Sequence, residues 1–391
     1  MTQNPIVFAF ASPTDLILKL PPDAGNQILS QSLSFSNPTS RYQACLNQIC
    51  LSAVLPWLQE DFAPQANPWL GFQNLHFFWE FVNGTAITVN NTRFILIASE
   101  AMDISELRVP QEWVDIPSWV GDYYLAVQVE PDDKYVRLWG YCTHKHLKNQ
   151  GSYDECDRTY SLEATEINNE MAILPVTLQL CPHETTKAQI QPLPKISLEL
   201  ARNLITRLGT SSLIAPRLEI PFQLWGALLE HGGWRKSLYY QRLGTEEQWS
   251  VVKWLENGVS QFAEAIGWTR LNLQLNAAGA RSTEEMPTST FVSRQLLIAG
   301  QSYELKIVPS QQEEMTIWRF ELRNAVESVA IPGGFKLRLL TEDLQPFPNN
   351  EDVATTAVEC LFVEVALEPG EGIVWEVEPL PENYDREILK F

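Results

Sequence analysis

Apolar residues recur at helical spacing after Asn37-Pro38. Asparagine is a favoured N-cap, and proline suits the first position of a helix, where no backbone N–H is needed. The side chains that then share one face are Tyr42, Leu46, Ile49, Ala53 and Trp57. This pattern predicts a helix over about 39–58.

Apolar runs separated by turn residues follow this helix. Residues 76–82, the pair Asn83-Gly84 and residues 85–89 are typical of a β-hairpin, because Asn-Gly supplies the positive φ angles of a type I′ turn. A further strand is expected over 92–98.

A second hairpin is expected from 123–129 and 135–141, joined by a Pro-Asp-rich turn at 130–133. With the preceding helix, these strands predict a mixed α/β N-terminal domain over 1–181 with a largely antiparallel sheet. The domain is expected to end near the proline-bearing stretch 182–194.

A helical period returns beyond this stretch. The apolar residues that recur every four positions are Ile196, Leu200, Leu204 and Leu208. Ser197 lies near the start of this run and Gly209 just past its end, so the spacing predicts an amphipathic helix.

Further helices are expected over 224–229 and 234–243. Thr245 and Gln248 match a capping box. The apolar face that follows consists of Trp249, Val252, Leu255, Val259, Phe262 and Ile266. It predicts one helix that stops at Gly267, and residues 195–268 are therefore predicted to form a helical region.

Alternation of period two begins at about residue 290. The six predicted strands cover 294–299, 303–308, 316–323, 335–340, 359–367 and 373–377. They favour a C-terminal β-sandwich over 290–391, and the whole chain is predicted to be α+β. Pro131, Pro309, Pro369 and Pro379 are each expected to end a strand, because proline cannot donate to a ladder.

Charge is distributed unevenly along the 391 residues. The net charge is −20, and residues 341–391 carry 13 acidic against 2 basic residues, which gives −11. Such a surface repels phosphate, so direct nucleic-acid binding is not expected. The charge suggests a basic protein partner instead, although an acidic surface that only keeps the protein soluble is an equal alternative.

The N-terminal residues lack the features of a secretory signal, since no basic residue precedes the short apolar run 6–11. No apolar stretch approaches the roughly 20 residues that a spanning helix needs. We therefore expect a soluble cytoplasmic protein without membrane association. Its six cysteines are expected to be reduced and mostly buried.

Cysteine and histidine residues form the most conspicuous candidate cluster. They are Cys142, His144 and His146, with Cys156, Cys181 and His183 downstream. Zinc prefers these ligands, but the paired spacing at both ends of a structural site is missing. We expect buried cysteines and surface histidines, with no metal or cofactor. Whether Cys142, His144, His146 and Cys156 converge is left open by the sequence.

Two acidic clusters, at 342–343 and 349–352, lack the ligand spacing of a calcium loop and are expected to be solvated turns. Nucleophile-elbow, zinc-protease, Walker and dinucleotide-binding motifs do not occur in the sequence. No catalytic residue is therefore predicted. The alternative is an unfamiliar active site around 137–142 and Asp157-Arg158.

Several segments resemble a cyanobacterial family of uncharacterised proteins over nearly the whole chain. They are Val109–Pro117, Gly121–Val129, Arg137–Tyr141, Asp157–Tyr160, Gly334–Leu344 and Glu382–Leu389. The resemblance implies a regulatory or scaffolding role, because genes of this family tend to lie near signalling and sigma-factor-like genes. It transfers no site residue.

These observations lead to one functional hypothesis and two alternatives. The hypothesis is a non-enzymatic interaction or signalling protein whose acidic C-terminal face docks a basic partner. The alternatives are an enzyme with an unrecognised site in the N-terminal domain and a structural subunit of a larger assembly.

Overall fold

The computed structural model describes residues 12–21, 34–132, 134–181, 184–245, 249–273, 289–312 and 315–391. The chain forms two compact units. Unit 1 comprises Met1–Ile196, Asn203–Glu230 and Leu238–Gly244, and unit 2 comprises Ser197–Arg202, His231–Ser237 and Thr245–Phe391. The helices of the predicted region 195–268 are shared between both units. This division rests on compactness, and the predicted domain limits stay predictions.

Unit 1 is built on a six-stranded sheet in the order β1-β7-β6-β4-β3-β2. Its strands are β1 (Leu16–Lys19), β2 (Asn67–Pro68), β3 (Thr85–Val89), β4 (Thr92–Ser99), β6 (Tyr123–Glu130) and β7 (Tyr135–Thr143). Neighbouring strands are antiparallel except β4 and β6, which are parallel. The predictions of a largely antiparallel sheet and of the 123–141 hairpin are confirmed.

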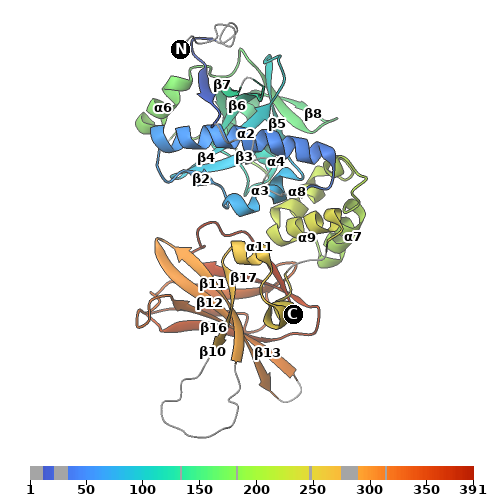
Figure 1. Cartoon of the computed structure of the whole chain (residues 1–391), viewed down its shortest axis with the longest axis vertical. Helices are drawn as coiled ribbons and strands as arrows, with labels where there is room; N and C mark the ends of the chain where they lie inside the picture. Colours follow the sequence, from blue (N-terminus) through green and yellow to red (C-terminus); the bar gives the residue numbers. More distant parts are fainter. Residues whose placement is uncertain are drawn as a thin grey trace. The chain divides into compact units, whose positions relative to one another are not determined.

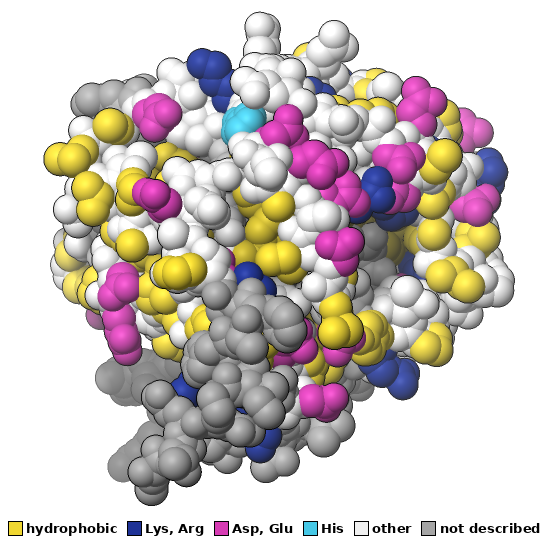
Figure 2. Space-filling view, turned by 90° about the horizontal axis from the view of Figure 1, so that it is seen from above, with side chains coloured by type: hydrophobic (Ala, Val, Ile, Leu, Met, Phe, Trp, Pro, Cys, Tyr) yellow, Lys and Arg dark blue, Asp and Glu magenta, His cyan; other side chains and the backbone are white. Residues whose placement is uncertain are grey.

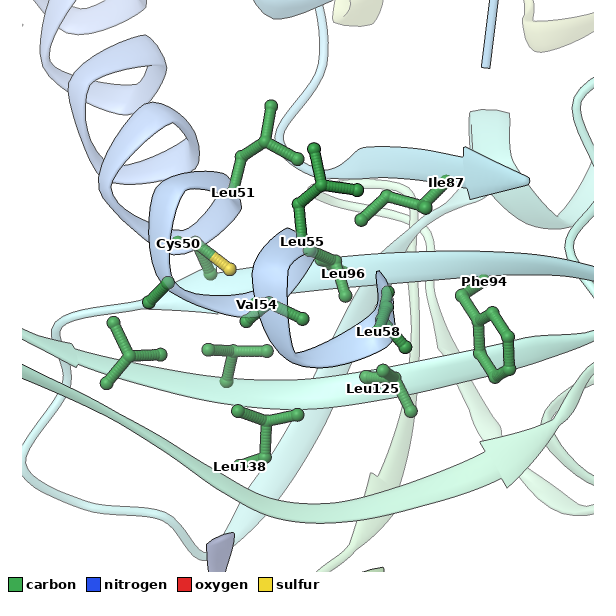
Figure 3. Close-up of a cluster of buried hydrophobic side chains, with 14 of the residues drawn as sticks. Cys50, Leu51, Val54, Leu55, Leu58, Ile87, Phe94, Leu96, Leu125 and Leu138 are labelled. Atoms are coloured by element: carbon green, nitrogen blue, oxygen red, sulfur yellow. The ribbon is translucent and has the colours of Figure 1, made fainter. Parts of the chain in front are cut away.

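The predicted first helix is present as α2 (Pro38–Asp61), with Asn37 as N-cap accepting from the Ser40 backbone N–H. It crosses one face of the sheet (Figure 1). Cys50, Val54 and Leu58 of α2 contribute to a buried cluster that also includes Leu96 and Leu125 of the sheet (Figure 3). Burial of this face stabilises the pairing of helix and sheet, at roughly 25 cal/mol for each Å² of apolar surface removed from water.

The Asn83-Gly84 hairpin was predicted wrongly. Residues Leu75–Trp79 form the short helix α3 instead of a strand, and all five are buried. The run lacks the alternation of a half-buried strand, so its composition alone suggested strand. The hairpin actually present joins β3 to β4, with Asn90 in the left-handed region.

Gly84 is not part of a hairpin turn, and its role is in packing. Its φ is +116°, and a Cβ there would lie 2.8 Å from Nε1 of Trp113. That indole nitrogen donates to the Asn83 carbonyl oxygen at 2.8 Å. The glycine is thus needed for close approach of a buried tryptophan.

A smaller sheet completes unit 1 in the order β5-β9-β8. The remaining elements of this part are β5 (Glu106–Pro110), β8 (Ser152–Asp154), β9 (Thr159–Glu163), α4 (Gln111–Asp115), α5 (His144–Gln150), α6 (Leu174–Leu180), η1 (Phe72–Asn74) and η2 (Met171–Ile173). Helix α4 follows β5 directly and α5 follows β7 directly, so both begin at strand ends of unit 1.

The middle of the chain contains α7 (Leu198–Leu208), η3 (Pro216–Leu218), α8 (Phe222–Glu230), α9 (Gly232–Leu243), α10 (Val251–Asn257) and α11 (Gln261–Ala265). The helices predicted after Ser197, over 224–229 and over 234–243 are confirmed. The single helix ending at Gly267 is wrong, because Gly258 at φ +94° ends α10 and Ser260 caps α11. Ser250 caps α10, and the predicted capping box involves Gln248, which lies outside the described residues.

Unit 2 contains two antiparallel sheets, in the orders β10-β11-β12-β13-β16 and β15-β14-β17-β18. The strands are β10 (Trp268–Leu273), β11 (Ser289–Ile298), β12 (Gln301–Gln312), β13 (Met315–Asn324), β14 (Lys336–Thr341), β15 (Glu351–Val353), β16 (Cys360–Ala366), β17 (Gly372–Glu378) and β18 (Ile388–Lys390). All six predicted strands are present. Aromatic contacts such as Trp318 with Phe391, at 4.7 Å between ring centroids, join the two sheets. The α+β prediction is confirmed.

Three of the four prolines follow the end of a strand. β6 and β17 end directly before Pro131 and Pro379, and β16 ends at Ala366, three residues before Pro369. Pro309 does not follow a strand end, because β12 continues to Gln312. It pairs with Trp318 of β13 but lies beyond Ile307, the last residue of β12 in register with β11. One side of the strand is thus an edge there, a position at which proline is tolerated.

Candidate functional site

Unit 1 contains a cavity of about 360 Å³ beside three of its helices. Its walls come from α4, α5, the start of α8 and the chain segment Gln189–Leu193, here named the edge segment. Polar and apolar groups are mixed in this wall. Four of the lining residues are glutamines, and Ile190 and Phe222 are among the apolar ones.

The Asp115 carboxylate at the end of α4 anchors the polar part of the wall. Its Oδ1 accepts from Nζ of Lys148 at 2.6 Å, and its Oδ2 accepts from the Tyr160 hydroxyl and from Nε2 of Gln111, both at 2.9 Å. Three donors therefore hold the carboxylate in one orientation.

Lys148 is held by the same cluster. Its ammonium group donates to the Tyr160 oxygen as well as to Asp115, and it lies 4.5 Å from the Tyr160 ring centroid. An ammonium group has three N–H donors. Two are used in these bonds, and a quarter of the Lys148 side chain is exposed. The third donor is available to an acceptor in the cavity.

Tyr160 is kept protonated by its surroundings. Burial, followed by the charge of Asp115, raises the pKa of the Tyr160 hydroxyl far above its ordinary value. Burial also raises the pKa of Tyr153, whose hydroxyl donates to Oε1 of Gln111 at 2.8 Å. General acid–base catalysis favours a pKa near the working pH. These tyrosines therefore act as hydrogen-bonding groups.

A second cavity of about 380 Å³ in unit 1 lies near the start of β6 and contains Asp122 in its wall. Asp122 accepts from the Arg93 backbone N–H at 2.8 Å and from the Thr186 hydroxyl at 2.7 Å. Burial, followed by Glu184, raises the pKa of neighbouring Tyr123 to about 12. Asp122 thus fastens the chain near Thr186 to the sheet.

His144 proves to be buried, against the expectation of a surface histidine. Its Nε2 lies 3.0 Å from the Val114 carbonyl oxygen, and its Nδ1 accepts from the Ala188 backbone N–H at 2.9 Å. The proton is therefore on Nε2, and burial lowers the pKa of the ring. Both nitrogens are used to join α4, α5 and the chain before the edge segment.

The cysteines show a mixed pattern. Cys142 is buried, and burial raises the pKa of its thiol, whereas Cys156 and Cys181 are exposed against expectation. His146 is half-buried, and His183 lies outside the described residues. In the part of the chain that the structure describes, no group of three or more His, Cys, Asp or Glu residues is arranged to hold a metal ion.

The residues of the alternative active site take part in structural contacts. Arg137 forms a buried ion pair with Asp15 at 2.6 Å. Arg158 donates to the carbonyl oxygens of Arg217 and Ile220. The structure does not place these side chains in the walls of either cavity described above.

Two other ion pairs of unit 1 contain fully buried carboxylates. Glu80 and Arg242 are paired at 2.8 Å with both side chains fully buried. Glu112 is equally buried and accepts from Arg217 at 2.7 Å and from the Trp225 indole at 2.8 Å. Enclosed pairs of this kind join distant parts of the chain, and their geometry indicates structural roles.

Many acids of the C-terminal segment are already paired. Seven of the 13 form ion pairs, namely Glu342, Glu351, Glu364, Glu376, Glu378, Asp385 and Glu387. Glu342 is buried between Arg202 and Lys390, so the expectation of a solvated turn is wrong there. In the second cluster Asn350 is buried, whereas Asn349 and Glu351 are exposed. Figure 2 shows the molecule from above the view of Figure 1, onto unit 1, where acidic side chains also lie among hydrophobic and basic ones.

Unit 2 also has an enclosed charged cluster. Arg294 is paired with Glu387, and its guanidinium carbon lies 5.2 Å from the Trp375 ring centroid. Asp385 is paired with Arg235 at 2.7 Å and with Lys236 at 2.9 Å. Through these pairs, Glu387 is bound to β11 and Asp385 to the first turn of α9.

Comparison with known proteins identifies the family. A family model described as "Protein of unknown function (DUF1822)" matches residues 18–390. The chain belongs to the DUF1822 family. The predicted resemblance to an uncharacterised family is confirmed, and the cyanobacterial origin stays a prediction. No curated protein and no solved structure matches the chain.

The described helices of this DUF1822 protein include none with the length and apolar character needed to cross a bilayer. The cavity residues were missed at the level of sequence, although Gln111, Asp115 and Tyr160 lie in segments that carry the family resemblance. Lys148 lies in the short basic stretch His144–Lys148, which carries too little charge to predict a nucleic-acid site. Nothing in the spacing of these residues shows that they meet.

Proposed function

We propose that this DUF1822 protein is a non-enzymatic interaction protein that binds a partner protein at the 360 Å³ cavity of unit 1. The observation that carries the proposal is the edge segment Gln189–Leu193. It borders the cavity, and its backbone forms no hydrogen bond with the described residues. Exposed backbone donors and acceptors beside a cavity are a common basis of peptide recognition.

The polar cluster supports binding rather than chemistry. Three donors hold the Asp115 carboxylate in place, and burial raises the pKa of the Tyr160 hydroxyl. A general acid or base works best with a pKa near the working pH, which Tyr160 does not have. Lys148 keeps one donor for a ligand.

The acidic C-terminal face is a weaker candidate for the same role. Over half of its acids are neutralised within unit 2 by the ion pairs described above. Each pair places an opposite charge beside a carboxylate and so reduces the field that would attract a basic partner. We therefore place the partner site at the cavity of unit 1.

Site-specific photo-cross-linking in the cells that produce the protein tests the proposal. A photoreactive amino acid replaces Gln191 in one variant of the full chain and Met102 in a control variant. Both positions are exposed, and Met102 does not line the cavity. We expect a discrete cross-linked protein from position 191 only. No adduct at 191, or the same adducts at 191 and 102, would contradict the proposal.

A further inference from the structure

The edge segment is ordered by its flanks. Before it, the Thr186 carbonyl oxygen accepts from the Lys145 N–H at 2.7 Å, and the Ala188 N–H donates to His144. At its end, the Leu193 side chain packs within 3.5 Å of the position that a Cβ on Gly226 would take. Contacts on both sides hold the segment against unit 1.

The edge segment belongs to no regular element, since no turn, bend, helix or strand is present from 185 to 197. Proline favours an extended backbone in the residue that precedes it, which applies here to Gln191 and Leu193. The N–H groups of Gln189, Ile190 and Gln191 have no hydrogen-bond partner among the described residues.

Four lysines lie beside the edge segment, two on its flanks and two in α5. Lys187 is paired with Asp122 and Lys148 with Asp115 of the cavity wall, whereas Lys145 and Lys195 form no ion pair with the described residues. Lys148 lines the cavity and keeps one N–H donor. This charge is complementary to an acidic partner, because opposite potentials across an interface favour encounter and suppress wrong partners.

We propose that an extended, acidic peptide of the partner protein pairs with the backbone of Gln189–Gln191 as an added strand and places a carboxylate on Lys148. This proposal rests on the proposed function and names the chemistry of the partner. Backbone pairing would supply affinity, and the amide and apolar walls near Gln223 and Phe222 would accept alternate side chains.

A random 12-residue peptide library displayed on phage, selected against the full-length protein, provides the probe. We expect selected peptides to be enriched in Asp and Glu. As synthetic peptides they should bind the Lys148→Met variant at least tenfold more weakly than the original protein. Lys19→Met, which changes an exposed lysine of β1 that does not line the cavity, should bind within threefold. Peptides without acidic enrichment, or equal losses in both variants, would overturn the assignment.

A pair of proline variants tests strand addition itself. Successive N–H groups along a strand point in opposite directions, so an added strand uses either the N–H of Ile190 or that of Gln191. We expect one of Ile190→Pro and Gln191→Pro to lose at least tenfold in peptide binding and the other to keep it within threefold. Equal behaviour of the two variants would overturn strand pairing.

The two proposals can fail separately. Thermal unfolding of each variant shows whether it is folded, and protection of the Ala188 amide from hydrogen exchange shows whether the edge segment keeps its attachment. A cross-linked partner at position 191 together with peptides that ignore both proline variants would leave the proposed function standing and reject strand addition.

Discussion

Two charged clusters, one in each unit, use the same chemistry with different access to solvent. In unit 2, Arg294 and Glu387 have side chains 9% and 1% exposed. In unit 1, Lys148 and Asp115 have side chains 25% and 15% exposed and line a cavity. Both clusters surround a carboxylate with a cation and aromatic rings. Both clusters are charged, so charge alone does not mark a candidate binding site. Access to a cavity distinguishes such a site from a buried ion pair that only stabilises the fold.

The difference also has an energetic meaning. An enclosed pair leaves an uncompensated buried charge when one partner is removed, which costs about 3–5 kcal/mol. Groups in the open cluster can recover water, so their removal costs less in stability. Variants of the enclosed cluster should therefore lose mainly stability, and variants of the open cluster should lose mainly binding.

Removal of Glu387 should have the largest effect. Glu387→Met leaves Arg294 buried without its partner, and we expect the free energy of unfolding to fall by about 3–5 kcal/mol. The double variant Arg294→Met, Glu387→Met should recover part of this loss, because the isolated charge is gone. Urea denaturation measures the free energy of unfolding of both variants. Hydrogen exchange of the β11 amides shows whether the loss lies around Arg294.

Glu364→Met is the matched control for that experiment. Glu364 pairs with Arg319 at 3.1 Å, but its side chain is 47% exposed. An exposed pair contributes less than about 1 kcal/mol. Equal losses in Glu387→Met and Glu364→Met would show that enclosure does not decide the role of a cluster.

Acid should weaken the same part of unit 2. Burial alone would raise the pKa of Asp385, but the charges of Arg235 and Lys236 outweigh it and lower this pKa from 3.8 to about 2. A lowered folded-state pKa gives stability that is present above about pH 4 and lost as pH falls towards 2. This loss amounts to about 2 kcal/mol for the shift cited.

The comparison of wild type with Asp385→Asn across pH 5 to 2 isolates this contribution. We expect the free energy of unfolding of the wild type to fall more steeply, by the about 2 kcal/mol of the pKa shift. Parallel pH curves would mean that Asp385 is not stabilised as a carboxylate in the folded state.

The open cluster should respond least. Tyr160→Phe removes the bond to Asp115 and an acceptor for Lys148, while Gln111 and Lys148 still hold the carboxylate. We expect a loss of about 1 kcal/mol in unfolding free energy. Tyr153→Phe is the control, since its partly exposed hydroxyl makes one bond. A loss for Tyr160→Phe as large as that of Glu387→Met would assign this cluster to stability as well.

Local signals predicted the fold best where they were explicit. Asn37-Pro38 marked the start of α2, and alternation found six strands of unit 2. Prediction failed where tertiary contacts decided the outcome. The composition of the run 76–82 predicts a strand, but Leu75–Trp79 form a helix. The pair Asn83-Gly84 predicts a turn, but Gly84 is required by the packing of Trp113.

The candidate site could not be predicted in the same way. Asp115, Lys148 and Tyr160 are separated by up to 45 residues and meet only because α4, α5 and β9 are neighbours in unit 1. Their residue types are common and fit no spacing rule. The edge segment was marked only as a proline-bearing stretch, since the absence of backbone partners is a property of the folded chain.

The attachment of Ala188 to a neutral His144 ring bears on the affinity with which a partner can bind. A flexible segment would have to be ordered when a partner binds, at a cost of about 1–2 kcal/mol for each residue fixed. Here the edge segment is already ordered when unit 1 folds, so binding does not have to order it. A partner would encounter a preorganised template, so more of the free energy of the contacts would remain as affinity.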